Sequence, residues 1–214
     1  MNRGLSICRN QPGSTAAGIT DWMTAIGTLG AVILALLTIF IGAIRRHLNK
    51  PILEVTFENQ EPYCRETQVT VALPVGHAKD RGYWLRLRVR NRGRSIARHC
   101  QGKLVSITEP VGDSRTDFDP IVLQWVTSNN PIDIGKEEFE YLDVLHSVKT
   151  RPDVFFIGAN TSRPAEETGI NLTPPRQDYL LRIVIYGENA DPLHKTFYLK
   201  NDQMFNKIRM TERR

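Results

Sequence analysis

An uncharged run of 23 residues, residues 22–44, constrains this chain more than any other feature. As an α-helix, a run of this length reaches roughly 35 Å, which is enough to cross a hydrocarbon core of about 30 Å with some tilt. A soluble protein would have to cover such a helix on every face. The run therefore predicts a transmembrane helix over residues 21–46, and the basic residues directly after it favour a retained anchor over a cleaved signal peptide.

The charges beside the span predict its direction. Arg45, Arg46 and Lys50 lie within six residues of its C-terminal end, whereas Asp21 lies directly before it. Because basic residues concentrate on the cytoplasmic side of membrane proteins, we expect the N-terminus outside and the C-terminal domain in the cytosol, in a cell inner or plasma membrane. Basic residues nearer the N-terminus oppose this bias, so the opposite topology stays open.

Small residues recur within the span at helical spacing, and this spacing places them on one face. Small side chains there would let two helix backbones approach closely, which predicts pairing of two spans and a homo-oligomer. An ordinary span also contains such residues, so both interpretations stay open. The candidate span-pairing residues are Gly27, Ala31, Ala35, Thr38 and Gly42.

The rest of the chain divides at the span. Residues 1–20 are rich in Gly, Ser and Asn without periodicity, which predicts a disordered tail. Residues 47–51 form a short connector, where Pro51 stops the helix from running on. Residues 52–200 are long enough for one domain with its own core. For residues 201–214 we expect a basic C-terminal tail or a short helix.

Residues 52–200 alternate in polarity and carry β-branched and aromatic residues between turn residues, which is typical of strands. No long amphipathic helix interrupts them, so the fold class is expected to be mainly β, with an antiparallel immunoglobulin-like β-sandwich after the helix. Residues 83–91 are expected to form a core strand, and residues 179–186 a central strand covered on both faces. The predicted strands are residues 52–58, 67–73, 83–91, 95–108, 121–126, 138–145, 154–157, 179–186 and 195–199.

The strand at residues 83–91 ends in Asn91-Arg92-Gly93, with Ala97 shortly after it. Asn and Gly both tolerate left-handed backbone conformations, and Ala97 suits a site too small for a larger side chain. This segment resembles a turn of immunoglobulin-like prokaryotic sandwich domains. Together with the span, the chain resembles uncharacterised prokaryotic single-span membrane proteins that carry such a sandwich, a resemblance that implies the fold and no activity.

Residues 81–103 contain eight basic residues and no acidic one, the strongest charge feature of the chain. Alternation would project three arginines and a tryptophan from one sheet face, where guanidinium groups suit phosphate or carboxylate. The alternative is internal: the acidic segment containing Asp133, Glu137, Glu138, Glu140 and Asp143 could pair with these arginines across strands. The candidate anion-binding or partner-binding residues are Trp84, Arg86, Arg88, Arg90, Arg92 and Arg94.

Catalytic and cofactor patterns are not found in the sequence. The histidines lack metal-site spacing, and His99 beside Cys100 would point to the opposite face of a strand. Asp113, Asp117 and Asp119 share a loop without the spacing of a calcium loop. We therefore expect no enzyme, no cofactor and no metal. The loops at residues 109–120 and 158–177 are interpreted as connectors or as sites of binding.

These features predict a membrane-anchored, non-catalytic binding or assembly module, a sensor or effector subunit of a membrane complex. Its expected partners are the lipid bilayer, a protein and a second copy through the span, but not nucleic acid. One alternative is a membrane-permeabilising effector whose span oligomerises under control of the sandwich. Another is an exported envelope or adhesion domain, in which Cys64 and Cys100 would form a disulfide.

Overall fold

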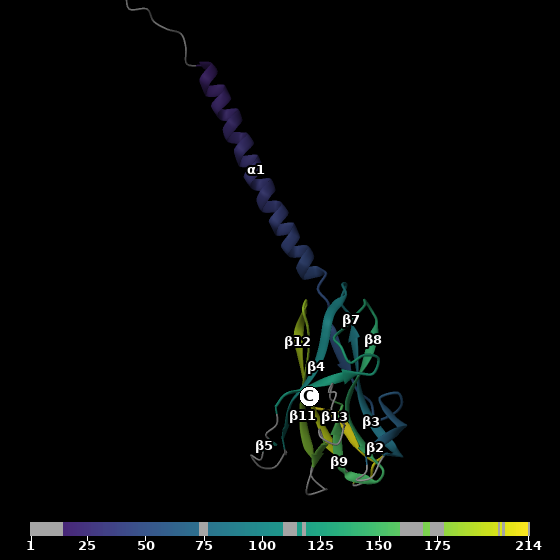
Figure 1. The fold of residues 1–214 in the computed structure, drawn as a ribbon. Coiled ribbons are helices and arrows are strands. Elements are labelled where there is room, and N and C mark those ends of the chain that lie inside the picture. Colours follow the sequence, from purple (N-terminus) through teal and green to yellow (C-terminus); the bar gives the residue numbers. More distant parts are fainter. Residues whose placement is uncertain are drawn as a thin grey trace, which may run out of the picture. The chain divides into compact units, whose positions relative to one another are not determined.

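A computed structural model describes residues 15–72, 77–108, 115–116, 119–158, 169–171, 178–200, 202 and 204–213. The chain divides into two compact units, Met1–Leu48 and Asn49–Arg214. Among the described residues, the first contains one helix and the second contains the strands (Figure 1). The chain is therefore mainly β with one N-terminal apolar helix, as predicted.

The helix α1 spans Thr15–Leu48 and is longer than the predicted span. Its segment Trp22–Gly42 has a mean hydropathy of 2.4 and buries none of its residues in the structure, so it is long and apolar enough to cross a membrane. Ala and Leu favour the helix, and Pro51 lies beyond its end. The predicted disordered tail is wrong for residues 15–20, which are helical, while residues 1–14 lie outside the described residues.

The strands of the second unit include all nine predicted ones, with shifted ends. The predicted strands do not include β5, β7, β10 and β13, which are only two to four residues long. The strands are β1 Leu53–Thr56, β2 Cys64–Ala72, β3 His77–Asn91, β4 Ala97–Thr108, β5 Arg115–Thr116, β6 Ile121–Trp125, β7 Ile132–Ile134, β8 Phe139–Val148, β9 Arg151–Ile157, β10 Gly169–Asn171, β11 Tyr179–Gly187, β12 Ala190–Lys200 and β13 Arg209–Glu212.

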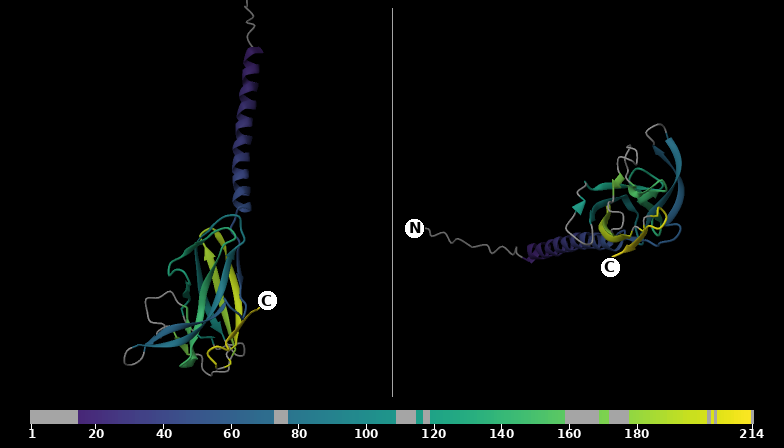
Figure 2. Two further views of the ribbon diagram at one scale, coloured as in Figure 1. Left: turned by 90° about the vertical axis from the view of Figure 1, so that its right-hand side faces the viewer. Right: turned by 90° about the horizontal axis from the view of Figure 1, so that it is seen from below.

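All pairings between these strands are antiparallel, and they join into one sheet of 13 strands. The main path runs β1-β3-β8-β6-β4-β11-β12-β13 and curls into a half-barrel around a core, as the end-on view of Figure 2 shows. The antiparallel prediction is confirmed, but two separate sheets are not, because β6 pairs with both β4 and β8 and so joins the two halves. The sandwich prediction is therefore not confirmed.

The strand β3 is the longest and positions the candidate site. Its C-terminal half pairs with β1 and β8, while its N-terminal half forms with β2 a hairpin that extends from the body of the sheet (Figure 2). Leu85, Leu87 and Val89 are fully buried, as the alternation predicts. The arginines within residues 86–90 therefore lie on the opposite, outer face.

The strand β11 is central, between β4 and β12, as predicted. Its coverage on both faces is not confirmed, because only one face is buried. Leu181 and Ile183 lie in the core, whereas Arg182 between them is exposed.

The C-terminal segment is a strand, which corrects the prediction of a tail or short helix. Residues Arg209–Glu212 form β13 and pair with the end of β12. Asn59, in the connection after β1, exchanges two hydrogen bonds of 2.9 Å with the backbone of Met210. One amide thereby joins the two edge regions of the sheet, and Met210 is fully buried.

The turn after β3 works differently from the prediction. Gly93 is required for close approach and not for a left-handed backbone, since a Cβ there would lie 2.4 Å from the Ile52 nitrogen and from the Pro51 Cα. Ala97 is fully buried, as expected. The left-handed conformations of non-glycine residues described here are at His99 and Glu137.

The long loops predicted as connectors or binding sites lie mostly outside the described residues. The loop residues outside the description are 109–114, 117–118, 159–168 and 172–177, and they include Asp113 and Asp117. Within the two loops the structure describes the short strands β5 and β10.

Candidate functional site

The outer face of β3 carries the predicted arginines, and their neighbours on β1 and β8 decide what each can bind. The strands are in register so that Arg86 faces Asp143, Arg88 faces Tyr141 and Arg90 faces Phe139. On the other side, β1 places Thr56 opposite Arg88 and Glu54 opposite Arg90. Each arginine therefore meets a different environment.

Arg86 is occupied within the domain. Its Nε donates to Asp143 Oδ1 at 2.7 Å, and both side chains are nearly buried, with 13% and 9% exposure. Burial raises the pKa of the Asp143 carboxyl, although the Arg86 guanidinium opposes this shift. A buried pair of this kind is unfit to bind an external anion, because its release would leave a charge unpaired.

Trp84 is also occupied, in a stack of three rings on the same outer face. The Trp84 and His146 rings lie 4.0 Å apart at 22°, and His146 and Phe156 lie 5.3 Å apart at 23°. These residues are paired across β3, β8 and β9. Burial lowers the pKa of His146 to about 4, so the imidazole is neutral at pH 7. One face of the ring of Trp84, a predicted binding residue, is therefore already covered by His146.

Arg90 and Arg92 have carboxylate partners as well. Arg90 Nη2 donates to Glu137 Oε2 at 2.6 Å, and Arg92 pairs with Glu54. Both pairs are partly exposed, so each contributes little stability, roughly 0–1 kcal/mol. The hypothesis of internal pairing with the acidic segment is thus confirmed for Arg86 and Arg90, while Arg92 pairs with an acid of β1.

Arg88 differs from its neighbours. Among the described residues no carboxylate pairs with it. Its buried Nε has no hydrogen-bond partner, which is also true of the Nε of Arg90. Its guanidinium carbon lies 3.9 Å from the centroid of the Phe139 ring, a cation–π contact. Thr56 and Tyr141, which flank Arg88 across the sheet, bring no negative charge. Arg88 is therefore a cation on an aromatic support.

Aromatic and aliphatic side chains lie in the row that continues from Arg88 across β8. Phe139 is 43% exposed and packs edge-to-face against Tyr141 at 5.7 Å. The backbone nitrogen of Val126, the residue directly after β6, donates to the Tyr141 carbonyl, and Val126 is 40% exposed. We call Arg88, Val126, Phe139 and Tyr141 the Arg88 surface. A positive charge beside exposed aromatic and aliphatic groups is a composition typical of protein interfaces.

The sequence indicated Arg88 but missed the other three residues. The alternation Phe139-Glu140-Tyr141 would have placed both aromatic rings on one face of a strand. The segment that contains it was interpreted for binding only by its acidic charge. The last candidate, Arg94, lies on the exposed turn after β3 and has no ion pair among the described residues. The six candidates therefore do not form one site.

The candidate span-pairing residues all lie in α1. Their steps of four, four, three and four residues place them on one helix face. Thr38 donates to the Ala35 carbonyl at 2.7 Å within the helix, and a Cβ at Gly27 would meet no atom within 4 Å. The structure leaves Gly27, Ala31, Ala35 and Thr38 exposed, with Gly42 less so.

The thiols are buried and protonated. Cys64 and Cys100 are free and buried, so the disulfide expected for an exported domain is not formed. Burial raises the pKa of Cys100 to about 11 and also raises that of Cys64. The neighbouring His99 is exposed and lies 3.2 Å from Glu188, so it turns away from Cys100 as predicted. Within the described part of the chain, no three His, Cys, Asp or Glu residues group as for a metal.

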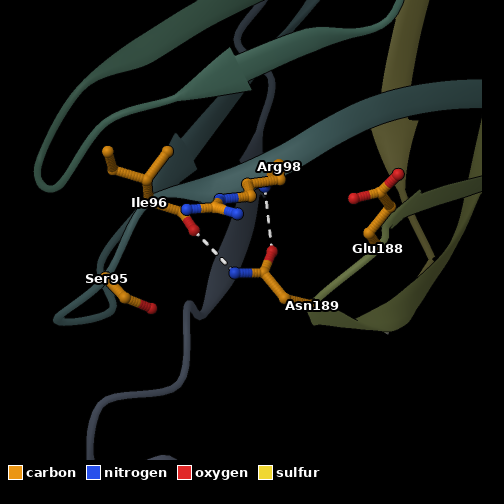
Figure 3. A pocket seen from close by; sticks show the side chains of 5 residues that line it. All are labelled: Ser95, Ile96, Arg98, Glu188 and Asn189. Atoms are coloured by element: carbon orange, nitrogen blue, oxygen red, sulfur yellow. Dashed lines mark hydrogen bonds between the residues drawn. The ribbon is translucent and has the colours of Figure 1, made fainter.

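A shallow depression lies beside the turn after β3. It has a volume of about 550 Å³ and is lined by Ser95, Ile96, Arg98, Glu188 and Asn189 (Figure 3). The Asn189 side chain hydrogen-bonds the backbone of Ile96 and Arg98 across it. Among the described residues, no buried polar group without a partner belongs to its lining.

Comparison with protein-family models finds no match, and comparisons with curated proteins and with solved structures find no significant relative.

Proposed function

We propose that the protein is a membrane-anchored, non-catalytic binding module that receives an acidic group of a protein partner on the Arg88 surface. The observation that carries this proposal is the environment of Arg88. Its guanidinium lies on Phe139 without a carboxylate among the described residues, although the neighbouring Arg86 and Arg90 each have one. A binding face with one unpaired charge among apolar groups gives direction and specificity to a contact.

The chemistry of the Arg88 surface suits a carboxylate. The guanidinium presents several N–H donors in a plane, so it can donate two parallel hydrogen bonds to one carboxylate. Phe139 holds this plane from one side and thereby reduces the entropy lost on binding. Val126 and Tyr141 would bury apolar surface of the partner around the charge, which excludes water and strengthens the pair.

The helix α1 supports the anchor. Its segment Trp22–Gly42 buries none of its residues within the structure, and lipid would cover its apolar side chains. The cytosolic orientation of the domain rests on Arg45, Arg46 and Lys50 after the span. An anchor of this kind confines the binding module to one surface and raises its local concentration there.

Site-specific photo-crosslinking from the full chain in its own membrane tests the binding site. A photoreactive amino acid at Val126 should form a discrete adduct with a protein, and Arg88→Ala should remove most of that adduct. Arg65→Ala is the matched control, because Arg65 is an exposed arginine on β2 outside the Arg88 surface. An adduct equally strong in the wild type and in Arg88→Ala would refute the proposed site.

Membrane insertion and orientation need a separate test. The full chain should stay with membranes after alkaline extraction. Because Cys64 and Cys100 are buried, a cysteine at exposed Met204 in a Cys8→Ser background is the suitable probe. An impermeant thiol reagent should label it only after the cells are permeabilised. Labelling in intact cells would instead support an exported domain.

The uncovered small-residue face of α1 supports pairing of two spans as part of the same proposal. Gly27→Ile together with Ala31→Ile should reduce dimer formation in membranes by crowding this face. Ile26→Leu together with Val32→Leu, which leaves the small residues unchanged, is the control. A wild-type chain that is monomeric in membranes would exclude span pairing without affecting the Arg88 surface.

A further inference from the structure

Two aliphatic side chains stand out on the β domain at the point where the chain enters it. Ile52 follows the connector and is 61% exposed, while Ile96 lies in the turn after β3 and is 48% exposed. The side-chain amide of Asn91 hydrogen-bonds the backbone at or next to both isoleucines. It accepts from the Ile52 nitrogen and donates to the carbonyl of Ser95, the residue before Ile96. The two isoleucines therefore belong to one end of the domain, which we call the connector end.

The exposure of Ile96 is built into the structure and is not a feature of a loose turn. Asn189 donates to the Ile96 carbonyl at 2.8 Å and accepts from the Arg98 nitrogen at 2.9 Å, which fastens the turn to the β11–β12 hairpin. Figure 3 shows the Ile96 side chain pointing away from Asn189 and Glu188. Water exposure of a rigidly held aliphatic group is unfavourable, so a partner surface would stabilise it.

Two cations of the connector end, Arg94 and Arg98, are available to an external anionic group. Three carboxylates of this end form ion pairs within the domain, Glu54 with Arg92, Glu137 with Arg90 and Asp191 with Lys50, while Asp133 and Glu138 accept hydrogen bonds from backbone nitrogens and Glu188 lies 3.2 Å from His99. Arg94 and Arg98 are exposed, and neither forms an ion pair with a described residue. Free cations beside exposed aliphatic groups therefore characterise this end.

Chain length brings the connector end close to the bilayer if α1 is inserted. The apolar segment ends at Gly42 and the helix at Leu48, so the last helical residues extend roughly 9 Å past the hydrocarbon core. Ile52 follows four residues later, within about 14 Å of chain. The headgroup layer adds roughly 5–8 Å on each side of the core. Ile52 and its neighbours are thus within reach of the headgroups.

We infer that Ile52, Arg94, Ile96 and Arg98 form a surface that docks the domain onto anionic phospholipid headgroups of the bilayer that holds α1. The isoleucines enter the boundary between headgroups and acyl chains, and the two arginines bind phosphates there. This inference rests on the proposed membrane anchorage and adds to it a second, orienting contact. Such a contact would determine which face of the domain lies on the bilayer. It would thereby also determine the direction in which the Arg88 surface points.

Fluorescence quenching in vesicles tests this contact with the full chain. The background is Cys8→Ser, and an environment-sensitive fluorophore is attached at Ile96→Cys or, as control, at Met204→Cys. Met204 is also exposed but lies beyond the C-terminal end of β12, while Asp191, which binds Lys50, lies near the start of that strand. The vesicles carry lipid with a quencher near the headgroups and contain either neutral lipid or a third of phosphatidylglycerol.

We expect several-fold stronger quenching at Ile96 than at Met204, greater in anionic than in neutral vesicles. Ile52→Asp with Arg94→Glu should remove this difference. If the chain floats with the vesicles but both probes are quenched equally, the docking inference fails while the anchorage stands. Quenching at Ile96 could instead be unaffected by the two substitutions and by lipid charge. That result would mean that the tether alone keeps Ile96 near the bilayer, and it would also overturn the docking inference. A chain that does not float with vesicles would refute the anchorage itself.

Discussion

The side-chain oxygen of Asn91 accepts a hydrogen bond from the Ile52 nitrogen at 3.2 Å, and this contact fastens the start of the β domain to the end of β3. The same oxygen accepts from the Gly93 nitrogen at 2.9 Å, while the amide nitrogen donates to the carbonyls of Ser95 and Ile134. Asn91 is fully buried and uses both ends of its side chain. It is therefore a structural centre of the connector end.

Asn91→Ala should strongly destabilise the domain. The substitution leaves two backbone nitrogens and two carbonyls without their partner. The Gly93 nitrogen and the Ile134 carbonyl are buried, and each of these two unsatisfied groups costs about 1–3 kcal/mol. We expect a loss of about 3 kcal/mol or more in the free energy of unfolding. Urea unfolding of the full chain in detergent, followed by tryptophan fluorescence, measures it. Asn130→Ala, at an exposed position, should unfold like the wild type.

Gly93→Ala should also destabilise the domain, for a steric reason. The new Cβ would lie 2.4 Å from two backbone atoms of Pro51 and Ile52, which cannot move without breaking the connector end apart. The expected loss is more than about 2 kcal/mol. Gly135→Ala is the matched control, because the Cβ there would meet only the flexible end of the Glu138 side chain. Equal unfolding midpoints for the two variants would contradict the steric explanation.

The Arg86–Asp143 pair should show strong coupling between its two members. Arg86→Leu or Asp143→Leu alone leaves a nearly buried charge without its partner, which we expect to cost about 3–5 kcal/mol. The double substitution removes both charges, so it should cost much less than the sum of the two. A double-mutant cycle from urea unfolding measures the coupling, and the exposed pair Arg81–Glu66 serves as reference. Additive effects at Arg86 and Asp143 would contradict a buried pair.

His146 should make the stability of the domain depend on pH. Its pKa in the folded state is about 4, against an ordinary value of 6.5, so between these values the unfolded chain binds a proton that the folded domain does not. The contribution is therefore full above about pH 6.5 and lost as the pH falls toward 4, by up to about 3 kcal/mol. His146→Phe keeps a ring between Trp84 and Phe156 and should flatten this part of the pH profile. A pH profile that keeps its slope in His146→Phe would contradict this explanation.

The sequence determined the elements that depend on local pattern. The uncharged run predicted the apolar helix, and the alternation around Leu85 and Leu87 predicted both the strand and its buried face. These features follow from the length of the run and from the period of two, which neighbouring residues alone decide. The short strands β7 and β13 carry no such pattern, and only their partners in the sheet make them strands.

The binding partner of each arginine of β3 could be predicted only in part. Opposite charges indicated that an acidic strand would face β3, and this is correct for Arg86 and Arg90. Which arginine receives which partner depends on the register between β3 and β8. No residue of either strand reveals this register alone, because it is set by the packing of the whole core.

An irregularity in β8 decides the candidate site. Leu85 faces Leu145 but Arg86 faces Asp143, so β8 holds one extra residue at this point. With regular pairing, Asp143 would point into the core, and Tyr141 and Phe139 with it. The sequence by itself therefore determined that a row of arginines lies on the outer face of β3. Only the tertiary structure decided that Arg88 faces aromatic rings instead of a carboxylate. The reason is that one extra residue in β8 moves the side chains on one side of it to the opposite face of the sheet.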